Sequence, residues 1–371
     1  MKIAYVVDED LSKTTGVSKK IASKIAIWEK MGHTVAIFSM RSGPGIHVAP
    51  SGVFRIRFGR LGKLLRHWRE VGKLNAYLKN FKPDIIYCRY IKFAPFLSQT
   101  LSTHGKYVVE VNTDDSVEFF RRGILNGVYN IITRSAFLTG ACGFVFVTNE
   151  LSQKKVFTKF NKPACIIGNG YILTELALES RKSKRRRSGQ INLVFAGTAG
   201  MSWHGIDKVI AMARGCPDFQ FHLAGFTSEA IKAKVPSNFK FHGWLNSAQL
   251  FRLYQDMDVA ISTLALHRNM MQEACPLKSR EYLSFGLPII SGYQDTDLSA
   301  PVNFVLQLEN CEDNVASAIS VIRSFCLGAR DISKASIMEF SATNLDSVPK
   351  ECSRIIFLES IVNGATVSGD D

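Results

Sequence analysis

The sequence has no long hydrophobic run, and this argues against a membrane-spanning protein. No stretch approaches the roughly 18–20 consecutive apolar residues that a transmembrane helix needs. The segment Met1–Asp10 is not a signal peptide, because only five apolar residues, Ile3–Val7, precede an acidic cluster, and an h-region needs about 7–15. Eight cysteines are present, but the closest pair is 15 positions apart, which excludes a C-x-x-C zinc or redox motif. We expect reduced thiols of a cytoplasmic protein, most of them in the core.

Two phosphate-binding fingerprints are also missing. The sequence contains neither G-x-G-x-x-G nor G-x-x-x-x-G-K-[ST], so it predicts neither the usual dinucleotide loop nor a P-loop. Acidic residues gather at Asp8–Asp10 and at Asp114–Asp115, but no histidine partners accompany them. We therefore expect no metal site and no resident cofactor.

The charge that is present lies mostly in the first half of the chain. The 371 residues carry 46 Lys or Arg and 32 Asp or Glu, a net charge of +14. Residues 1–170 contribute +15, residues 171–190 contribute +4 and residues 191–371 contribute −5. Such asymmetry indicates two domains with different partners, the first of them facing an anion. Nucleic acid, a membrane surface and a phosphorylated substrate remain open at this point.

The most basic region, Arg55–Arg89, also carries an apolar stripe. Its members recur at steps of three and four residues and are Leu61, Leu64, Leu65, Trp68, Val71, Leu74 and Leu78. This spacing predicts a helix with one apolar and one cationic face. Two interpretations stay open: a helix packed on the core with a solvated basic surface, or a surface helix on an anionic membrane. Nucleic acid is less favoured, because no binding motif accompanies the charge.

Short apolar runs alternate with helical patterns along both halves of the chain. The runs predict strands at 2–7, 34–39, 85–88, 106–111, 143–148 and 164–168, and then at 191–196, 219–224, 239–242, 259–262 and 288–291. Near-continuous apolar strands between helices are typical of parallel sheets covered on both faces, so the predicted class is α/β with two doubly wound domains. We expect domains at 1–170 and 191–345, a basic linker at 171–190, and a C-terminal helix at 346–371 that packs toward the first domain. Ligands should bind at the carboxyl ends of the strands, in a cleft between the domains.

Two segments carry features of an anion site. Gly16 lies between the first strand and the first helix, where a glycine lets a ligand approach backbone N–H groups. Glu273 and Glu281 flank Pro276, which starts a predicted helix at 277–285, and Lys278 lies in the first turn of that helix. The start of this helix would present N–H groups to phosphate.

The second segment resembles the signature of the family 4 retaining glycosyltransferases, which have the GT-B fold. That signature is Glu, seven residues, Glu, and a short helix that ends in Gly-x-Pro, as in Glu273, Glu281, Gly286 and Pro288. The resemblance extends over most of the chain, through segments 32–35, 146–149, 167–171, 195–197, 241–244 and 250–259.

The resemblance implies roles for particular residues. It implies that Glu281 holds the nucleotide ribose and that Glu273 bonds hydroxyls of the donor sugar. The remaining donor-binding positions that it implies are Gly16, Gly197, Thr198, Gly243, Cys275, Pro276 and Leu277. Lys278 and His204 would act on the diphosphate beside Glu273. Because negative charge grows on the departing diphosphate, amides and cations aimed there would be the main catalytic device.

The sequence departs from the family at the phosphate clamp. Thr198 stands where the family usually has arginine, and His204 precedes Gly205 where the family usually has lysine. A protonated His204 could donate to phosphate, and Lys278 or Lys208 could supply the missing charge. On the acceptor side, Arg89, Tyr90 and Asn112 follow predicted strands; Asn112 occupies a place where the family often has histidine.

The function that the resemblance implies is transfer of a hexosyl group from a nucleotide sugar to a glycan or lipid-linked acceptor. It would retain anomeric configuration, need no metal and serve cell-surface polysaccharide biosynthesis. Two locations stay open: free in the cytoplasm, or peripheral on the inner face of the membrane. The basic first domain would face the acceptor and an anionic membrane surface, and we expect no nucleic-acid partner. The alternatives are a catalytically weak binding or scaffold subunit, which the Thr198 departure motivates, and a sugar-nucleotide 2-epimerase.

Overall fold

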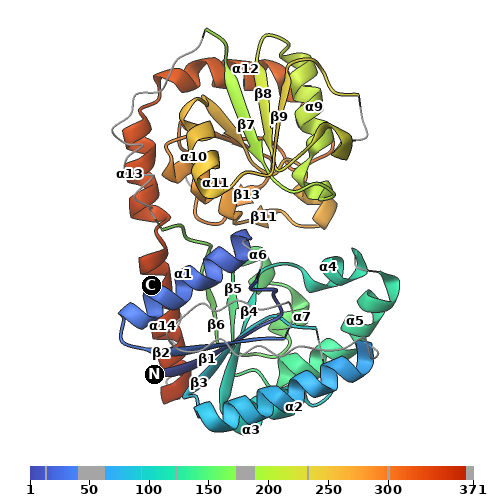
Figure 1. The fold of residues 1–371 in the computed structure, drawn as a ribbon, viewed down its shortest axis with the longest axis vertical. Helices are drawn as coiled ribbons and strands as arrows, with labels where there is room; N and C mark the ends of the chain where they lie inside the picture. The colour runs from blue at the N-terminus through green and yellow to red at the C-terminus, as the bar shows by residue number, and fades with distance from the viewer. Residues whose placement is uncertain are drawn as a thin grey trace. The chain divides into compact units, whose positions relative to one another are not determined.

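The computed structural model describes residues 1–12, 15–40, 63–92, 94–121, 123–172, 189–231, 234–298 and 301–364; the side chains of 63–69 are not described. The chain divides into two compact units. Unit 1 comprises Met1–Gly168 and Ser347–Asp371, and unit 2 comprises Asn169–Asp346. Each unit contains a six-stranded sheet with helices around it (Figure 1).

The sheet of unit 1 is parallel throughout, in the order β2-β1-β3-β4-β5-β6. Its strands are β1 (Lys2–Val7), β2 (Thr34–Ser39), β3 (Ile85–Arg89), β4 (Lys106–Val111), β5 (Gly143–Phe146) and β6 (Ala164–Ile166). The helices are α1 (Gly16–Lys30), α2 (Lys63–Phe81), α3 (Leu97–His104), α4 (Asp115–Arg121), α5 (Ile124–Thr139), α6 (Asn149–Ser152), α7 (Lys155–Thr158) and α14 (Ser347–Asn363). Every residue of β1 after Lys2 is buried, as expected for a central strand covered on both faces.

Helices cover both faces of this sheet. On one face, Trp28 of α1 and Leu358 of α14 pack against Tyr5 and Tyr87. On the other face, Tyr77 of α2 lies with its ring centroid 5.6 Å from that of Phe38. On α2, Val71, Leu74 and Leu78 are buried. This half of the predicted apolar stripe therefore belongs to the core, while residues 55–62 and the side chains of 63–69 lie outside the described part.

Helix α14 is tied to the sheet by buried polar groups. Trp28 Nε1 donates to Glu351 Oε2 at 3.0 Å, and Arg354 donates to the same carboxylate at 2.9 Å. Arg354 Nη1 also donates to the Tyr87 hydroxyl at 2.9 Å. All these side chains are nearly or fully buried, and a buried charge is tolerated only when it is paired in this way.

A second ionic cluster lies in the same core, around Glu110 of β4. The Glu110 carboxylate is fully buried and accepts from Lys24 at 2.9 Å, Lys20 at 3.1 Å and the Tyr5 hydroxyl at 3.2 Å. Burial alone would raise its pKa, but Lys20 and Lys24 hold the pKa of Glu110 well below its usual range. Two lysines thus share one buried carboxylate; Lys24 is buried with it, and Lys20 is partly exposed.

The sheet of unit 2 is also parallel, in the order β14-β12-β10-β7-β8-β9. Its strands are β7 (Asn192–Ala196), β8 (Gln220–Ala224), β9 (Phe239–Gly243), β10 (Val259–Ile261), β12 (Ile289–Ser291) and β14 (Val305–Gln307). A small parallel pair joins β11 (Glu273–Ala274) to β13 (Gln294–Asp295). The α-helices are α9 (Ile206–Gly215), α10 (Ser247–Gln255), α11 (Leu277–Ser284), α12 (Ile319–Gly328) and α13 (Lys334–Asn344). Short 3-10 turns are η1 (Ser202–His204), η2 (Ser228–Ala230), η3 (Leu266–Asn269), η4 (Ala316–Ala318) and η5 (Ala329–Asp331).

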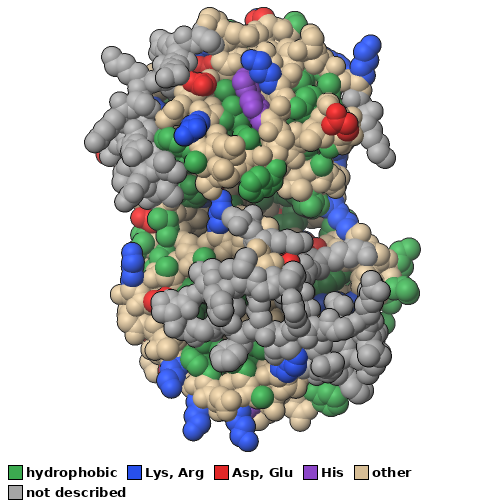
Figure 2. Space-filling model, viewed as in Figure 1, with side chains coloured by type: hydrophobic (Ala, Val, Ile, Leu, Met, Phe, Trp, Pro, Cys, Tyr) green, Lys and Arg blue, Asp and Glu red, His purple; other side chains and the backbone are tan. Residues whose placement is uncertain are grey.

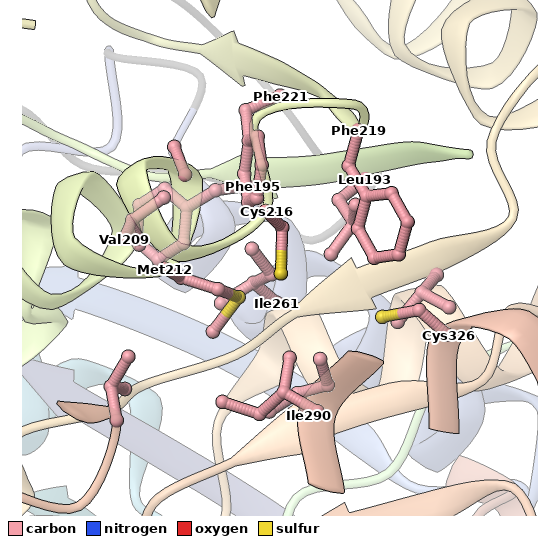
Figure 3. Packing of buried hydrophobic residues seen from close by; sticks show 14 of the residues in the cluster. Leu193, Phe195, Val209, Met212, Cys216, Phe219, Phe221, Ile261, Ile290 and Cys326 are labelled. Atoms are coloured by element: carbon pink, nitrogen blue, oxygen red, sulfur yellow. The ribbon is translucent and has the colours of Figure 1, made fainter. Parts of the chain in front are cut away.

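A hydrophobic core of unit 2 lies between its sheet and helices α9 and α12. Figure 3 shows Phe195 and Leu193 of β7, Phe221 of β8 and Ile261 of β10 packed against Met212 of α9. Close packing of these aliphatic and aromatic side chains holds the strands in fixed positions, and so it fixes where the ends of the strands lie. The predicted α/β class with two parallel-sheet units is confirmed.

Two sequence-based expectations need comment. Most of the predicted linker at 171–190, including residues 173–188, lies outside the described residues. All eight cysteines are free thiols, but only Cys88, Cys216, Cys275 and Cys326 are buried. Cys142 and Cys165 are partly buried and pack against the core of unit 1, so the expectation that most cysteines lie in the core is confirmed; Cys352 is half-buried and Cys311 is exposed.

Candidate functional site in unit 2

Glycine turns crowd together where β7, β8 and β9 end. Gly197 N donates to Ala224 O at 3.1 Å, and Gly225 N donates to Gly243 O at 2.6 Å. A Cβ placed on Gly225 would lie 1.9 Å from Gly197 O. Backbone therefore meets backbone with no side chain between, at the strand ends where α/β sheets bind ligands.

This crowding predicts the effect of a matched pair of substitutions. Gly225→Ala should destabilise the protein, because Gly225 has φ +86° and the new methyl group would overlap a carbonyl oxygen. Gly200 has the same left-handed backbone, φ +84°, with no atom within 4 Å of the position of its Cβ. Chemical denaturation should show Gly225→Ala at least about 2 kcal/mol less stable than Gly200→Ala. Equal losses would show that the turn relaxes freely.

Lys278 brings an unpaired cation to this end of β7. It lies in the first turn of α11, which begins after Pro276 and has no side-chain cap. The Lys278 ammonium is buried, has no hydrogen-bond partner among the described residues, and lies 4.1 Å from the centroid of the Phe195 ring. Burial lowers the pKa of Lys278 to about 7. An anion placed there would supply the missing partner and restore the proton.

His204 also lies beside the Phe195 ring. Its imidazole is 5.5 Å from Phe195, centroid to centroid, and a Cβ on Gly197 would lie 3.1 Å from its Nδ1. Burial, and then the neighbouring Lys278, lower the pKa of His204 to about 3, while a hydrogen bond with the Thr198 backbone acts in the opposite direction. In the ligand-free protein the ring is therefore neutral at pH 7, and its Nδ1 has no hydrogen-bond partner among the described residues. Donation to phosphate by a protonated His204 stays a prediction.

Glu281 is held from behind by a buried tyrosine. The Tyr254 hydroxyl donates to Glu281 Oε1 at 2.7 Å, and burial together with Glu281 raises the pKa of Tyr254 well above its ordinary value. The Tyr282 hydroxyl accepts from Ala196 N at 2.8 Å, which ties α11 to the end of β7. One carboxylate oxygen of Glu281 is thus positioned by the fold, on the same helix as Lys278.

A buried arginine shapes the loop that leads into α11. Arg280 is fully buried and donates to Asp295 Oδ1 at 2.6 Å, to Asp297 Oδ2 at 2.5 Å and to Asn169 O at 3.1 Å. Asn169 N in turn donates to Cys275 Sγ at 2.8 Å. These bonds hold Cys275 and Pro276 in place, with Glu273 just before them on β11, opposite Gln294. Arg280 and Asp295 were not among the site residues predicted from the sequence. An arginine within a helix that is otherwise expected to be buried indicates a buried acidic partner, and this signal could have identified Arg280.

Lys208 does not join this cluster. Its ammonium donates to Cys311 O at 2.5 Å and to Asn314 Oδ1 at 2.9 Å. The suggestion that Lys208 replaces the missing clamp residue is therefore wrong. Lys278 is the lysine that lies beside Phe195 and His204.

In unit 1, the three residues predicted for the acceptor side line one pocket. Arg89, Tyr90 and Asn112 are joined in its lining by Asp8, Glu9, Lys92, Thr113, Asp115, Glu118 and Phe119. The Tyr90 hydroxyl donates to Asp115 Oδ2 at 3.0 Å, and Asn112 Oδ1 accepts from Lys20 at 3.0 Å. The Asn112 amide nitrogen is buried and unpaired within the described part of the chain. A ligand hydroxyl or carbonyl could satisfy it.

Gly16 is the first residue of α1, in unit 1. The Thr15 side chain accepts from Ser18 N at 3.1 Å, and Ser18 Oγ accepts from Thr15 N at 2.8 Å. This capping box already satisfies the amide of Ser18, which leaves fewer free donors at this helix start than the sequence suggested.

Among the residues that the structure describes, no helix is long and apolar enough to cross a bilayer. The described part of the chain also contains no group of three His, Cys, Asp or Glu side chains placed to hold a metal ion.

Comparison with known proteins gives matches by structure alone. No family model and no curated protein matches the sequence. Sucrose-phosphate synthase from Thermosynechococcus elongatus is similar over 98% of this chain and 99% of its own, with TM-score 0.75 and 15% identity. The catalytic domain of starch synthase IV from Arabidopsis thaliana, solved with ADP and acarbose, covers 98% and 99%, with TM-score 0.69 and 11% identity. WaaG, a glycosyltransferase involved in lipopolysaccharide biosynthesis, covers 95% and 99%, with TM-score 0.67 and 16% identity.

These likenesses extend over nearly the whole chain, and they confirm the predicted GT-B fold. At such low identity a likeness shows how the chain folds. Its function has to be argued from the residues of the site.

Proposed function

We propose that this protein is a retaining glycosyltransferase that moves a hexosyl group from a nucleoside-diphosphate sugar to a glycan or lipid-linked acceptor. The observation that carries the proposal is the buried, unpaired Lys278 ammonium at the end of β7, next to the start of α11. A cation without a partner in a dry site is costly unless an anionic ligand completes it. The GT-B likeness and the Glu273–Glu281 spacing support a sugar nucleotide as that ligand.

In this proposal the donor diphosphate lies between Lys278 and the glycine turns. Amides at Gly197, Thr198 and Cys275–Leu277 would donate to its oxygens, and neutral His204 would donate through one ring N–H. Glu281, positioned by Tyr254, would bind the ribose, and Gly243 would lie near the base. Glu273 would bond the hydroxyls of the sugar. Starch synthase IV, which shares the fold, was solved with ADP.

The chemistry follows from where charge develops. As the sugar–phosphate bond breaks, negative charge accumulates on the departing diphosphate, where Lys278 and the helix amides would stabilise it. The acceptor hydroxyl would give its proton to the leaving phosphate, so Asn112 need not act as a base. The pocket with Arg89, Tyr90 and Asn112 is the acceptor site of this proposal. We place the reaction in cell-surface polysaccharide biosynthesis, by analogy with WaaG.

A second candidate function, a binding or scaffold subunit, is suggested by the lack of charged residues at Thr198 and His204, the positions of the phosphate clamp. Thr198 carries no charge, and His204 is neutral. A chain that binds a nucleotide but turns it over slowly would act as a binding or scaffold subunit. Release of nucleoside diphosphate from the sugar nucleotide distinguishes the two, because a scaffold gives none.

Glu281→Ala tests the donor site. Removing a carboxylate that bonds ribose hydroxyls should weaken nucleotide binding about tenfold to a hundredfold. Calorimetric titration with UDP, GDP and ADP, with and without chelator, would measure the loss. Glu339→Ala on α13 is the matched control, since Glu339 is exposed in the same unit. Unchanged affinity in Glu281→Ala would refute the site.

A further inference from the structure

Helix α5 turns an aliphatic face outward. Ile124, Leu125 and Ile132 are 74%, 87% and 73% exposed, and Val128 and Ile131 are 43% and 44% exposed. At a helical repeat these five residues form one face of the first two turns. Figure 2 shows hydrophobic side chains at the edge of unit 1 where Figure 1 draws α4 and α5. Isolated exposed apolar residues are ordinary, but a contiguous aliphatic face marks an interaction site.

The polar face of α5 points into the protein and holds the helix in this orientation. Asn130 is buried and its amide donates to Asp115 Oδ2 at 2.5 Å, and Arg134 donates to the same carboxylate at 3.1 Å. Gly127 lies directly under the Phe120 ring of α4. Rotating α5 to bury its aliphatic face would break these bonds and leave Asp115 without its cation.

Positive charge predominates in the sequence from α5 onward. From Phe119 to Lys162 the sequence contains seven Lys or Arg and a single acid, Glu150. Lys159 Nζ donates to Ser135 Oγ at 3.1 Å, and Ser135 lies at the same helical angle as the aliphatic face. Lys92 contacts the opposite side of α5, at Asn126. An aliphatic helix face in a cationic segment suits the headgroup region of an anionic bilayer.

We propose that α5 is the element that inserts into the surface of an anionic membrane. A second copy of the chain is a poorer occupant, because a symmetric contact would bring the same cations against each other. The exposed residues of the face are aliphatic, whereas protein interfaces favour Tyr, Trp and Arg. The inference adds a second candidate to the basic stripe of Arg55–Arg89, of which Val71, Leu74 and Leu78 are buried and the side chains of residues 55–69 lie outside the described part.

This inference deepens the proposed function by naming how the enzyme would reach a lipid-linked acceptor. It does not need the donor site. Vesicle binding without any nucleotide tests α5, while the Glu281→Ala titration tests the donor site without any vesicle. Either can fail alone.

The test is flotation of the full chain with vesicles of phosphatidylcholine, with and without phosphatidylglycerol. The double substitution Leu125→Gln with Ile132→Gln removes two inserting side chains without changing charge. We expect binding to phosphatidylglycerol vesicles to fall at least about tenfold. The matched control is Val348→Gln with Ile356→Gln on α14, two residues of the same unit that are 45% and 66% exposed, and it should bind as the parent protein does.

Thermal unfolding of the three proteins shows whether each is folded. Because Leu125 and Ile132 are so exposed, their substitution should leave the midpoint unchanged. Failure of the parent protein to bind phosphatidylglycerol vesicles would overturn the proposal. Unaltered vesicle binding by the α5 variant would also overturn it. If sedimentation velocity shows that the parent is a dimer and the α5 variant is a monomer that still binds vesicles, the aliphatic face is a dimer contact and the proposal fails.

Discussion

Replacing Lys278 with methionine should stabilise the free protein and weaken nucleoside-diphosphate binding at least about a hundredfold. The ammonium is buried without a partner, so the folded protein bears its desolvation cost until an anion arrives. Methionine has a similar shape and no charge. We expect a gain of roughly 1–4 kcal/mol at pH 7 in denaturation, and calorimetry with UDP, GDP and ADP should show the loss of binding.

The same lysine predicts a pH dependence with a definite sign. Burial lowers its pKa to about 7 from an ordinary value of 10.5, so between these values the unfolded chain binds more protons than the folded one. The contribution of Lys278 to stability should therefore rise as pH rises from about 7 to 10.5. Nucleotide affinity should fall over the same range, because binding requires the proton. Both trends should disappear in Lys278→Met.

The matched control is Lys240→Met, because Lys240 is an exposed lysine of the same unit. It should change neither stability nor affinity appreciably. If Lys278→Met proves less stable than the parent and binds nucleotide normally, the ammonium has a structural role, and the proposed function loses its main support.

The second large effect that we expect is a loss of stability in Glu110→Gln, of roughly 3–5 kcal/mol at pH 7. The substitution keeps the shape of the side chain but leaves Lys20 and Lys24, at 3.1 and 2.9 Å, without their counter-charge in a buried site. Urea denaturation followed by circular dichroism would measure the loss. Glu359→Gln on α14 of the same unit should change stability by no more than about 0.5 kcal/mol.

A double variant separates charge from packing. Lys24→Met in the Glu110→Gln background removes one stranded cation and should recover part of the stability. No recovery would mean that the loss comes from hydrogen bonds or packing. In the parent protein, stability should fall as acid protonates Glu110, whose pKa lies well below the ordinary 4.5; this loss therefore comes only below that value.

The strands could be predicted from sequence because burial on both faces leaves a plain signal. The prediction for 106–111 coincides with β4, and that for 34–39 coincides with β2. The pair of strands β11 and β13 was missed, because a strand of two residues is too short to show an alternation of apolar and polar residues. Helix α5 was not among the predicted helices, although its apolar residues recur at helical spacing; in the structure this apolar face points outward and Asn130 is buried.

The site could be predicted in part for a similar reason. Glu273, Pro276 and Glu281 lie close in sequence, so their spacing carries information. The side-chain partners are set by the fold: Tyr254 reaches Glu281, and Lys208 turns away to Cys311 and Asn314. Residues far apart in sequence, such as Tyr87 and Arg354, are brought together by the fold, and no local pattern predicts their contact.

The return of α14 to unit 1 has a consequence for synthesis on the ribosome. The chain leaves unit 1 at Gly168 and comes back at Ser347, where Tyr171 N donates to Leu345 O at 2.9 Å and brings the two ends of unit 2 together. Unit 2 is thus an insertion between two segments of unit 1. The sheet of unit 1 is translated before α14, so Trp28 and Tyr87 lack their partners Glu351 and Arg354 until the end of synthesis. We therefore expect apolar surface of unit 1 to stay exposed during elongation, and also in a chain that is truncated before Ser347.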